Sequence, residues 1–404
     1  MPSVDATADT SAPPTPTPIA ITLTEPAANL VAAYRDGDSA WTPAPAPINE
    51  TYTFIVRSRT WSFAWACAAT LSNGERRAYA YTLSFTVAER TKFAAPASCP
   101  RGATGVTIDG TITNAPVGSY LPYFGALGGS IVGGGTNNTY TFSVLRKPGT
   151  HDLYIALREP VGGRDDTIKI AVKRGVAAVT NINNLIVDFA TAVATTPPLP
   201  VTVTTGDPNV DTAARTIFYD GSGTLVDLDY SWVGPPHTTR GIAASQLGTG
   251  YVYEQAIRAR RCSTDYCDFV DVEHWSQTIA AQAVTVPPFL GSVTTTPSPT
   301  SLTLTWPAYA SAIGYTFFVQ QGGALIWQGT LGGAYAATSP EFVIPDMSGL
   351  AGWSEYILRS TYQSSGFVQA VTSTAGATDF PPAYPAPAGT DRVFARGHVL
   401  APPQ

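Results

Sequence analysis

The sequence is poor in charged residues, and in lysine above all. Lysine occurs four times in 404 residues, and Asp, Glu, Lys and Arg together make up 13% of the chain, roughly half of the share of about 25% that is usual in soluble domains. The balance is acidic, with a net charge of −6. Because a nucleic-acid-binding surface needs clustered cations, we expect no nucleic-acid partner.

The sequence also lacks long apolar runs and clustered metal ligands. No stretch of about 18 apolar residues is present, so no transmembrane helix is predicted. The histidines are scattered and the cysteines form no CxxC pair, whereas a zinc site needs ligands a few residues apart. The motifs GxSxG, HExxH, the Walker A loop and a helix-opening GxGxxG are missing as well. We therefore predict no resident metal, no cofactor and no catalytic residue.

The four cysteines are even in number and fall into two pairs along the chain. The economical prediction is two local disulfides, Cys67–Cys99 and Cys262–Cys267, which implies an oxidising compartment. The alternative is four buried thiols in a cytosolic chain, and the low lysine and high threonine content disfavours it.

Residues 1–18 are rich in Thr, Pro and Ala and predict an extended, semi-rigid tether. Such a tract is typical of the segment between an export signal or lipid anchor and the first domain of a surface protein. We expect that the natural export signal has been removed, and that the protein is extracellular or bound to the cell surface.

Alternation of apolar and polar residues is the dominant pattern in the chain, and helical periodicity is almost absent. It recurs in segments 79–87, 153–157, 168–172 and 302–306, with Gly, Pro, Asn and Asp between the runs. A strand with this pattern buries one face and exposes the other to water, as in antiparallel sandwiches. The predicted fold class is all-β, with tandem immunoglobulin-like antiparallel β-sandwiches.

Pro-rich segments divide the chain into pieces of the size of single sandwiches. Short Pro-rich linkers of this kind predict separate modules in a row, with limited flexing between neighbours. The predicted units are a tether (1–18), four sandwiches (19–99, 100–194, 195–287 and 288–380) and a Pro-rich tail with one strand (381–404).

The fourth unit resembles a fibronectin type III module. Ser301–Trp306 (SLTLTW) matches the second strand with its core tryptophan, and Ile313–Val319 matches the third. Trp353–Arg359 fits the sixth strand in this resemblance. The resemblance implies a sandwich with Trp306 at its centre.

Two other units carry weaker resemblances, and the first unit carries none. In 195–287, Tyr253–Arg260 is similar to a sixth fibronectin type III strand, with Trp275 near the start of the last strand; Cys262 and Cys267 would then close a hairpin tip. The unit 100–194 resembles carboxypeptidase-regulatory-like or PEGA-type sandwiches through Gly105–Gly110, Tyr140–Phe142 and Lys147–Tyr154. As a whole the chain resembles modular surface lipoproteins of bacteria, which implies an interaction scaffold and not an enzyme.

Acidic residues provide the weakest site candidates. Asp36 and Asp38 in the segment YRDGDS suggest either a calcium loop or a plain turn, and the distal Glu of an EF-hand is missing. Further acids lie near expected hairpin tips, and two of them could serve a glycosidase only if the fold held them on either side of a sugar cleft. These further acids are Asp165, Asp166, Asp265, Asp268, Asp271 and Glu273.

Aromatic residues near turns are the candidate ligand contacts: Tyr230, Trp232, Trp327 and Trp353. Exposed aromatic side chains at the end of a sandwich stack on sugar rings or anchor protein partners. The alternative for each of them is a place in the core beneath a loop.

The tail segment around Val393, Phe394, Val399 and Leu400 reads as one further strand. It either pairs within its own chain, stays disordered, or adds to a neighbouring molecule and so builds polymers.

Three hypotheses on function follow. The first is an exported, non-catalytic surface scaffold for adhesion or ligand binding, with other proteins or surface glycans as partners. The second is a structural subunit of a filament, surface layer or virion that assembles through sheet edges or the tail. The third is an accessory protein that binds polysaccharide, or an enzyme that acts on it.

Overall fold

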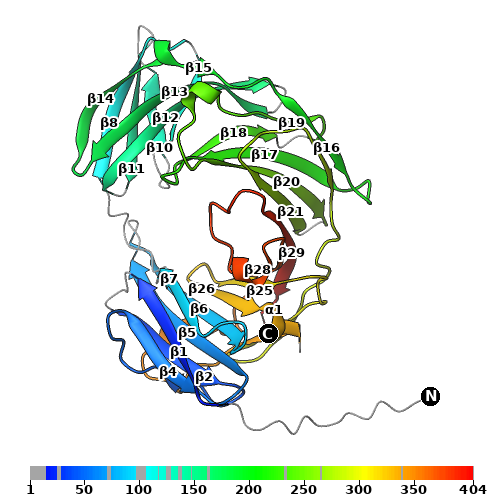
Figure 1. Cartoon of the computed structure of the whole chain (residues 1–404). Helices are drawn as coiled ribbons and strands as arrows, with labels where there is room; N and C mark the ends of the chain where they lie inside the picture. The colour runs from blue at the N-terminus through cyan, green and yellow to red at the C-terminus, as the bar shows by residue number, and fades with distance from the viewer. Residues whose placement is uncertain are drawn as a thin grey trace.

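The computed structural model describes residues 15–24, 29–70, 74–96, 106–116, 118–123, 129–134, 139–146, 148–161, 164–231, 234–263, 266–337 and 340–403. These residues form four β-sandwiches that lie along an open ring (Figure 1). The predicted fold class, tandem immunoglobulin-like and fibronectin type III-like sandwiches, is confirmed. The described helices are short: α1 (Gly333–Ala337) and 3₁₀ turns at Phe189–Thr191, Ala244–Gln246, Ser354–Tyr356 and Gly376–Asp379. None of them has the length and apolar character that a bilayer crossing requires.

The first three sandwiches share one topology, in which the first strand pairs antiparallel with a middle strand and parallel with the last one. In the first sandwich, one sheet consists of β4 (Thr51–Val56), β1 (Thr17–Thr24) and β7 (Lys92–Pro96). The other sheet consists of β3 (Thr42–Pro43), β2 (Val31–Asp36), β5 (Thr60–Thr70) and β6 (Arg76–Thr86). In the second sandwich, one sheet consists of β10 (Gly129–Gly134), β11 (Tyr140–Arg146), β8 (Val106–Thr113) and β14 (Ile182–Asp188). The other sheet consists of β9 (Ser119–Tyr123), β12 (Gly149–Val161) and β13 (Arg164–Ala178), with β15 (Val193–Ala194) beside β13. In the third sandwich, one sheet consists of β19 (His237–Thr239), β16 (Leu199–Thr204) and β22 (Gln282–Thr285). The other sheet consists of β18 (Leu225–Ser231), β17 (Asp211–Tyr219), β20 (Val252–Cys262) and β21 (Cys267–Ser276).

The fourth sandwich has a different arrangement, with an antiparallel first strand. One of its sheets consists of β23 (Thr294–Pro297), β24 (Leu302–Thr305) and β27 (Glu341–Ile344). The other consists of β26 (Leu325–Gly332), β25 (Gly314–Gln321), β28 (Ser364–Ser373) and β29 (Asp391–Ala401). Trp306 is buried against Tyr315, their ring centroids 5.4 Å apart. The sixth strand predicted at Trp353–Arg359 is wrong: the sixth strand is β28, and the earlier segment is a 3₁₀ turn with a loop that covers the core.

The tail is the last strand of the fourth sandwich. β29 pairs antiparallel with β28 over ten residues and with β21 of the third sandwich over six. Val399 and Phe394 are buried, Val393 is half-buried, and Leu400 is exposed. Residues 391–396 of this strand are therefore paired on both edges and the remainder on one, so a tail that is free of its own chain is contradicted.

The sandwiches are joined edge to edge as well as through their linkers. β6 pairs in parallel with β26, β29 pairs with β21, and β18 pairs with β13. One sheet consequently runs through all four sandwiches in the order first, fourth, third, second. A simple row of modules in chain order is contradicted, because edge strands leave unpaired N–H and C=O groups, and here neighbouring sandwiches supply their partners.

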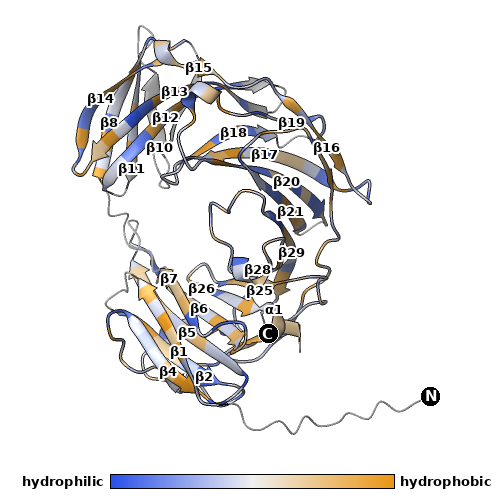
Figure 2. Ribbon diagram, viewed as in Figure 1, coloured by the Kyte–Doolittle hydropathy of each residue, from blue (hydrophilic) through white to orange (hydrophobic). Residues whose placement is uncertain are grey.

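In the first sandwich, strands β5 and β6 are buried on both faces of their sheet. One face carries large residues such as Trp61, Phe63 and Phe85, which pack against β1 and β4, and these strands are strongly apolar (Figure 2). The other face carries small residues, and Ala66 and Ala80 belong to the core cluster of the fourth sandwich. Alternation in β5 and β6 therefore separates a large-residue face from a small-residue face, and neither of these faces is exposed to water.

Candidate functional site

The face of the third sandwich that looks into the ring carries polar side chains on regular strands. In β17 the side chain of Phe218 points into the core cluster, and its neighbours of opposite parity line a pocket outside. The loop between β28 and β29 enters the ring beside this face (Figure 1). The resulting cavity, here called the central pocket, has a volume of about 270 Å³. Its lining residues are Ala213, Ala214, Arg215, Ile217, Tyr219, Tyr230, Glu254, Ala256, Arg258, Asp271, Glu273 and Tyr384.

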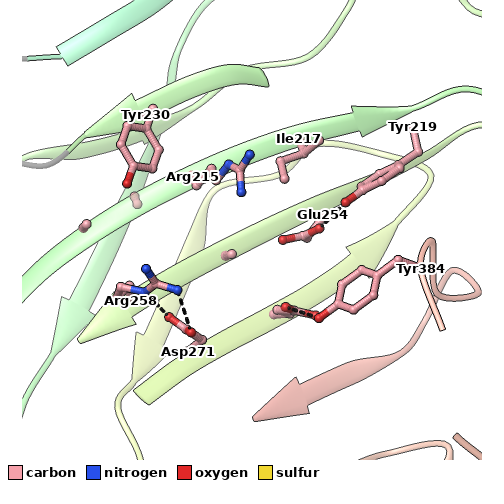
Figure 3. Close-up of a pocket in the computed structure, with 12 residues that line it drawn as sticks. Arg215, Ile217, Tyr219, Tyr230, Glu254, Arg258, Asp271 and Tyr384 are labelled. Carbon is pink, nitrogen blue, oxygen red and sulfur yellow. Dashed lines mark hydrogen bonds and ion pairs between the residues drawn. The ribbon is translucent and has the colours of Figure 1, made fainter. Parts of the chain in front are cut away.

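Two buried carboxyl groups lie on neighbouring strands in the lining of the central pocket, and Figure 3 shows one of them, Glu254, beside Tyr219. Glu254 of β20 accepts a hydrogen bond from the Tyr219 hydroxyl at 2.8 Å. Glu273 of β21 accepts from the Tyr384 hydroxyl at 2.9 Å and from the Trp275 indole N–H at 3.1 Å. Only 5% of Glu254 and 6% of Glu273 is exposed.

Burial shifts both carboxyl groups in the same direction. It raises the pKa of Glu273 to about 7, with the nearby Glu254 charge adding to the effect. Burial also raises the pKa of Glu254. A glycosidase needs environments that push two carboxyl pKa values apart, so that one is a proton donor and the other an anion. Here burial raises both pKa values, and the charge of Glu254 raises that of Glu273 further.

Two arginines at the other end are held by acidic partners. Arg258 forms a two-pronged ion pair with Asp271, with contacts of 2.6 and 2.9 Å. Arg215 pairs with Asp227 at 2.7 Å, and its guanidinium lies 5.9 Å from the ring centroid of Tyr230. Tyr230, one of the aromatic residues singled out from the sequence, is therefore half-buried in the wall of the central pocket.

The other predicted aromatic contacts do not reach this site. Trp327 and Trp353 are buried in the core of the fourth sandwich, 0% and 1% exposed, with ring centroids 6.4 Å apart. The Trp327 indole donates to the Tyr356 carbonyl at 2.8 Å. Their prediction as ligand contacts is wrong because the loop before β28 folds over them. Trp232 lies outside the described residues.

The acidic loop at Asp36 is a turn in this structure. The Asp36 carboxylate accepts the backbone N–H of Arg57 at 2.9 Å and that of Ser58 at 2.8 Å, while Asp38 is exposed. In the described part of the chain, no three His, Cys, Asp or Glu side chains come together as metal ligands would. Asp36 thus anchors a neighbouring loop by its two oxygens.

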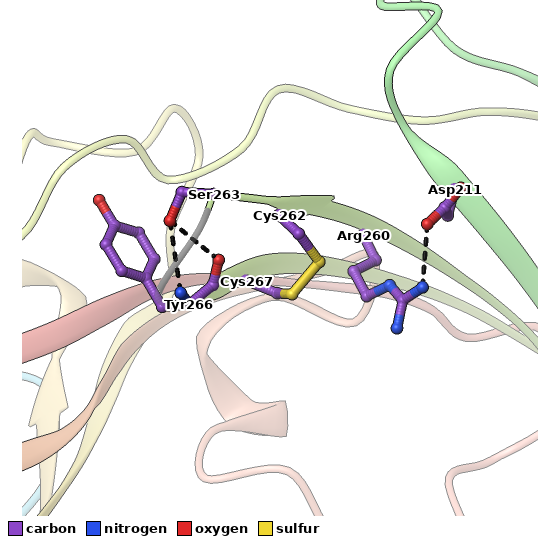
Figure 4. Close-up of a disulfide and its surroundings, with 6 residues drawn as sticks. All are labelled: Asp211, Arg260, Cys262, Ser263, Tyr266 and Cys267. Carbon is purple, nitrogen blue, oxygen red and sulfur yellow. Dashed lines mark hydrogen bonds and ion pairs between the residues drawn. A yellow bond between two sulfur atoms is a disulfide. The ribbon is translucent and has the colours of Figure 1, made fainter.

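The cysteines close the hairpin between β20 and β21 (Figure 4). Cys262 and Cys267 form a disulfide with their Cα atoms 4.0 Å apart. Next to it, the Tyr266 ring stacks on His398 of β29 at 4.7 Å, so this hairpin tip also contacts the fourth sandwich. Cys67 is disulfide-bonded too, and its predicted partner Cys99 lies outside the described residues.

The central pocket as a set was missed from the sequence. The alternation of side chains along β20 indicates part of the pocket, because Glu254, Ala256 and Arg258 lie on the same face of the strand. No local pattern indicates that Tyr384, more than a hundred residues later, completes the wall.

Comparisons with known proteins give little further information. No protein-family model matches the chain, and no curated protein matches it. The FN1–FN3 domains of chicken CNTN1 are similar at 9% identity, covering 72% of this chain and 90% of that chain, with a TM-score of 0.18. A tetra-tandem repeat from the extending region of a large adhesion protein is similar at 11% identity, covering 95% and 99%, with a TM-score of 0.14. At these TM-scores the likeness carries no argument about function.

Proposed function

We propose that the protein is an exported, non-catalytic binding scaffold whose ligand is a carbohydrate held in the central pocket. The observation that carries this proposal is the pocket itself: acceptors, donors and tyrosine rings converge on one sheet face. Strands position a binding group more rigidly than loops do. The edge-to-edge sheet further fixes the third sandwich between its neighbours.

The chemistry of the central pocket suits a polar, hydroxyl-rich ligand. Arg215 and Arg258 are neutralised by acids, and burial raises the pKa of both buried glutamates. Hydroxyl-rich sugars need donors and acceptors around the ring edge, together with apolar or aromatic surface against the ring face. Tyr230 and Ile217 supply the apolar surface in this pocket.

The remaining features of the proposal concern location and partners. Disulfides support an oxidising, extracellular location, and a lipid anchor before the tether is part of the same proposal. The likeness of 100–194 to carboxypeptidase-regulatory-like or PEGA-type modules stays a proposal as well. Adhesion to surface glycans or glycoproteins is the expected use of such a scaffold. A filament or surface-layer subunit is less favoured, because the tail strand is paired within its own chain.

Calorimetric titration with soluble oligosaccharides tests the proposal. Cellobiose, cellohexaose, digalacturonate and hexagalacturonate cover short, long, neutral and acidic chains. At least one should bind, and Arg258→Ala should weaken it about tenfold or more through loss of charge-assisted hydrogen bonds. Arg77→Ala is the matched control, because Arg77 pairs with nearby Glu75 in the first sandwich, away from the central pocket.

A second measurement separates binding from catalysis. Prolonged incubation should leave each oligosaccharide at its original length, as judged by chromatography. Release of shorter products that disappears in Glu273→Gln would contradict the non-catalytic assignment. Equal binding by the wild type and the Arg258→Ala variant would remove the central pocket from the proposal.

A further inference from the structure

A row of aromatic rings and guanidinium groups leads away from the central pocket into the fourth sandwich. It consists of Arg258, Phe269, Arg396, Phe367 and Phe318, each on the strand next to the previous one, and all are partly exposed. Arg258 lies 5.4 Å from the centroid of Phe269, and Arg396 lies 5.9 Å from Phe269 and 4.2 Å from Phe367. Phe367 and Phe318 stack at 5.6 Å. We call this row the aromatic–arginine strip.

The register of the sheet places the strip on the same face as the central pocket. Phe269 stands opposite Arg396, and Phe367 stands opposite Phe318. Directly opposed residues in a sheet point to the same side. Asp271, two residues from Phe269 in β21, lines the central pocket and therefore shares this face.

A second hollow lies at the far end of the strip, where the first and fourth sandwiches meet. It has a volume of about 200 Å³ and is called the joint pocket here. Phe318 and Phe367 belong to both the strip and the lining of this pocket. Its polar lining residues include Thr316, Gln328 and Thr330. The strip thus connects two hollows on one continuous sheet face.

Arg396 differs from the other arginines of this face in its partner. Its guanidinium donates to the side-chain oxygen of Gln369 at 2.8 and 3.2 Å. Arg215, Arg258 and Arg260 all have carboxylate partners, and Arg396 has none within the described ranges. Burial lowers its pKa. Asp271 is the nearby carboxylate and is itself bonded to Arg258. A cation held between two rings with no carboxylate in direct contact is complementary to an anionic group on a ligand.

Other classes of polymer fit this face less well. A peptide that adds as a strand needs a free sheet edge, and every strand under the strip is paired on both sides. A nucleic acid needs many more cations than this acidic chain provides. Strands lie about 4.8 Å apart, so successive strands offer stacking positions at intervals comparable to the length of a sugar ring.

We propose that the strip binds a linear acidic polysaccharide, which runs across the strands from the central pocket to the joint pocket and places a carboxylate on Arg396. This inference rests on the proposed function and adds the class of glycan, its length and its direction. The stacked rings bind the sugar faces, and Arg396 selects the acid.

Titration calorimetry with hexagalacturonate and digalacturonate tests the proposal on the full chain. The hexamer should bind at least about tenfold more tightly than the dimer, because it engages the strip in addition to the pocket. Arg396→Gln should weaken the binding of hexagalacturonate about tenfold or more and change the affinity for cellohexaose less than twofold. Arg396→Lys should retain part of the affinity, because it keeps the charge and loses the planar group. Thermal melting confirms that each variant is folded.

The outcomes separate the strip from the pocket. If Arg396→Gln binds hexagalacturonate as the wild type does while Arg258→Ala does not, the strip proposal is overturned and the central pocket remains. If cellohexaose binds and hexagalacturonate does not, the acidic class is wrong and the proposed function stands. If neither binds, both proposals are overturned.

Discussion

Glu273 is the residue at which burial and charge most clearly change the behaviour of the molecule. Its carboxyl group has two donors, Tyr384 and Trp275, and almost no contact with solvent. The unfolded chain has a pKa near 4.5 for this group, and the folded protein raises it to about 7. The folded state therefore binds the proton more tightly than the unfolded state does.

This difference predicts how stability depends on pH. The contribution of Glu273 is fully present below pH 4.5 and is lost as the pH rises through 7. Glu273→Gln keeps a neutral group at all pH values, so it should be more stable than the wild type at about pH 8, on the order of 2 kcal/mol. Denaturant unfolding at about pH 5 and about pH 8 measures the effect. The exposed Glu341→Gln is the control, and an equal pH dependence in wild type and Glu273→Gln would contradict the prediction.

At the scale of elements, the small-residue face of β5 and β6 explains how two sandwiches share a core. Ala66 and Ala80 are 0% exposed and stand opposite each other in the register. They lie in one cluster with Trp327 and Trp353 of the fourth sandwich. Large rings on that side need small partners on this one, since protein interiors are packed without room for extra volume.

Enlarging one of these alanines should therefore disturb the joint. Ala66→Leu is expected to destabilise the protein by about 1–3 kcal/mol through overpacking, as measured by chemical unfolding. Ala46→Leu, at an exposed loop position, is the matched control and should change stability little. If the Ala66→Leu variant is as stable as the wild type, the space between the two sandwiches is not filled.

At the scale of the whole molecule, the joint between the second and third sandwiches depends on one buried cation. Asp166 of β13 stands directly opposite Asp229 of β18, a pair of like charges that would repel each other. Arg240 contacts Asp166 at 2.7 Å and Asp229 at 2.6 Å, and all three side chains are nearly buried. The arginine thus turns a repulsive pairing into a connection between sandwiches.

Removing this cation should open the ring at that joint. Arg240→Leu leaves two buried carboxylates without their arginine, at an expected cost of about 3–5 kcal/mol. Small-angle X-ray scattering should show a larger radius of gyration as the second sandwich separates from the third. Arg77→Leu, at an exposed pair of the first sandwich, should leave the scattering curve unchanged. An unaltered curve for Arg240→Leu would assign the joint to the backbone pairing alone.

Alternation, turn residues and spacing are local, so the amino-acid sequence alone was enough to predict the all-β class, the core position of Trp306 and the Cys262–Cys267 pair. Tertiary structure decided the rest. Whether the second face of β5 and β6 meets water or another sandwich depends on a partner hundreds of residues away. The tail became a central strand, the two tryptophans became core, and Tyr384 joined Glu273 in one pocket. The place of the tail follows from edge pairing between distant strands, whose backbone hydrogen bonds are the same for any sequence and leave no local pattern. The tryptophans and Tyr384 are placed by loops that pack against distant strands, and these contacts leave no local pattern either.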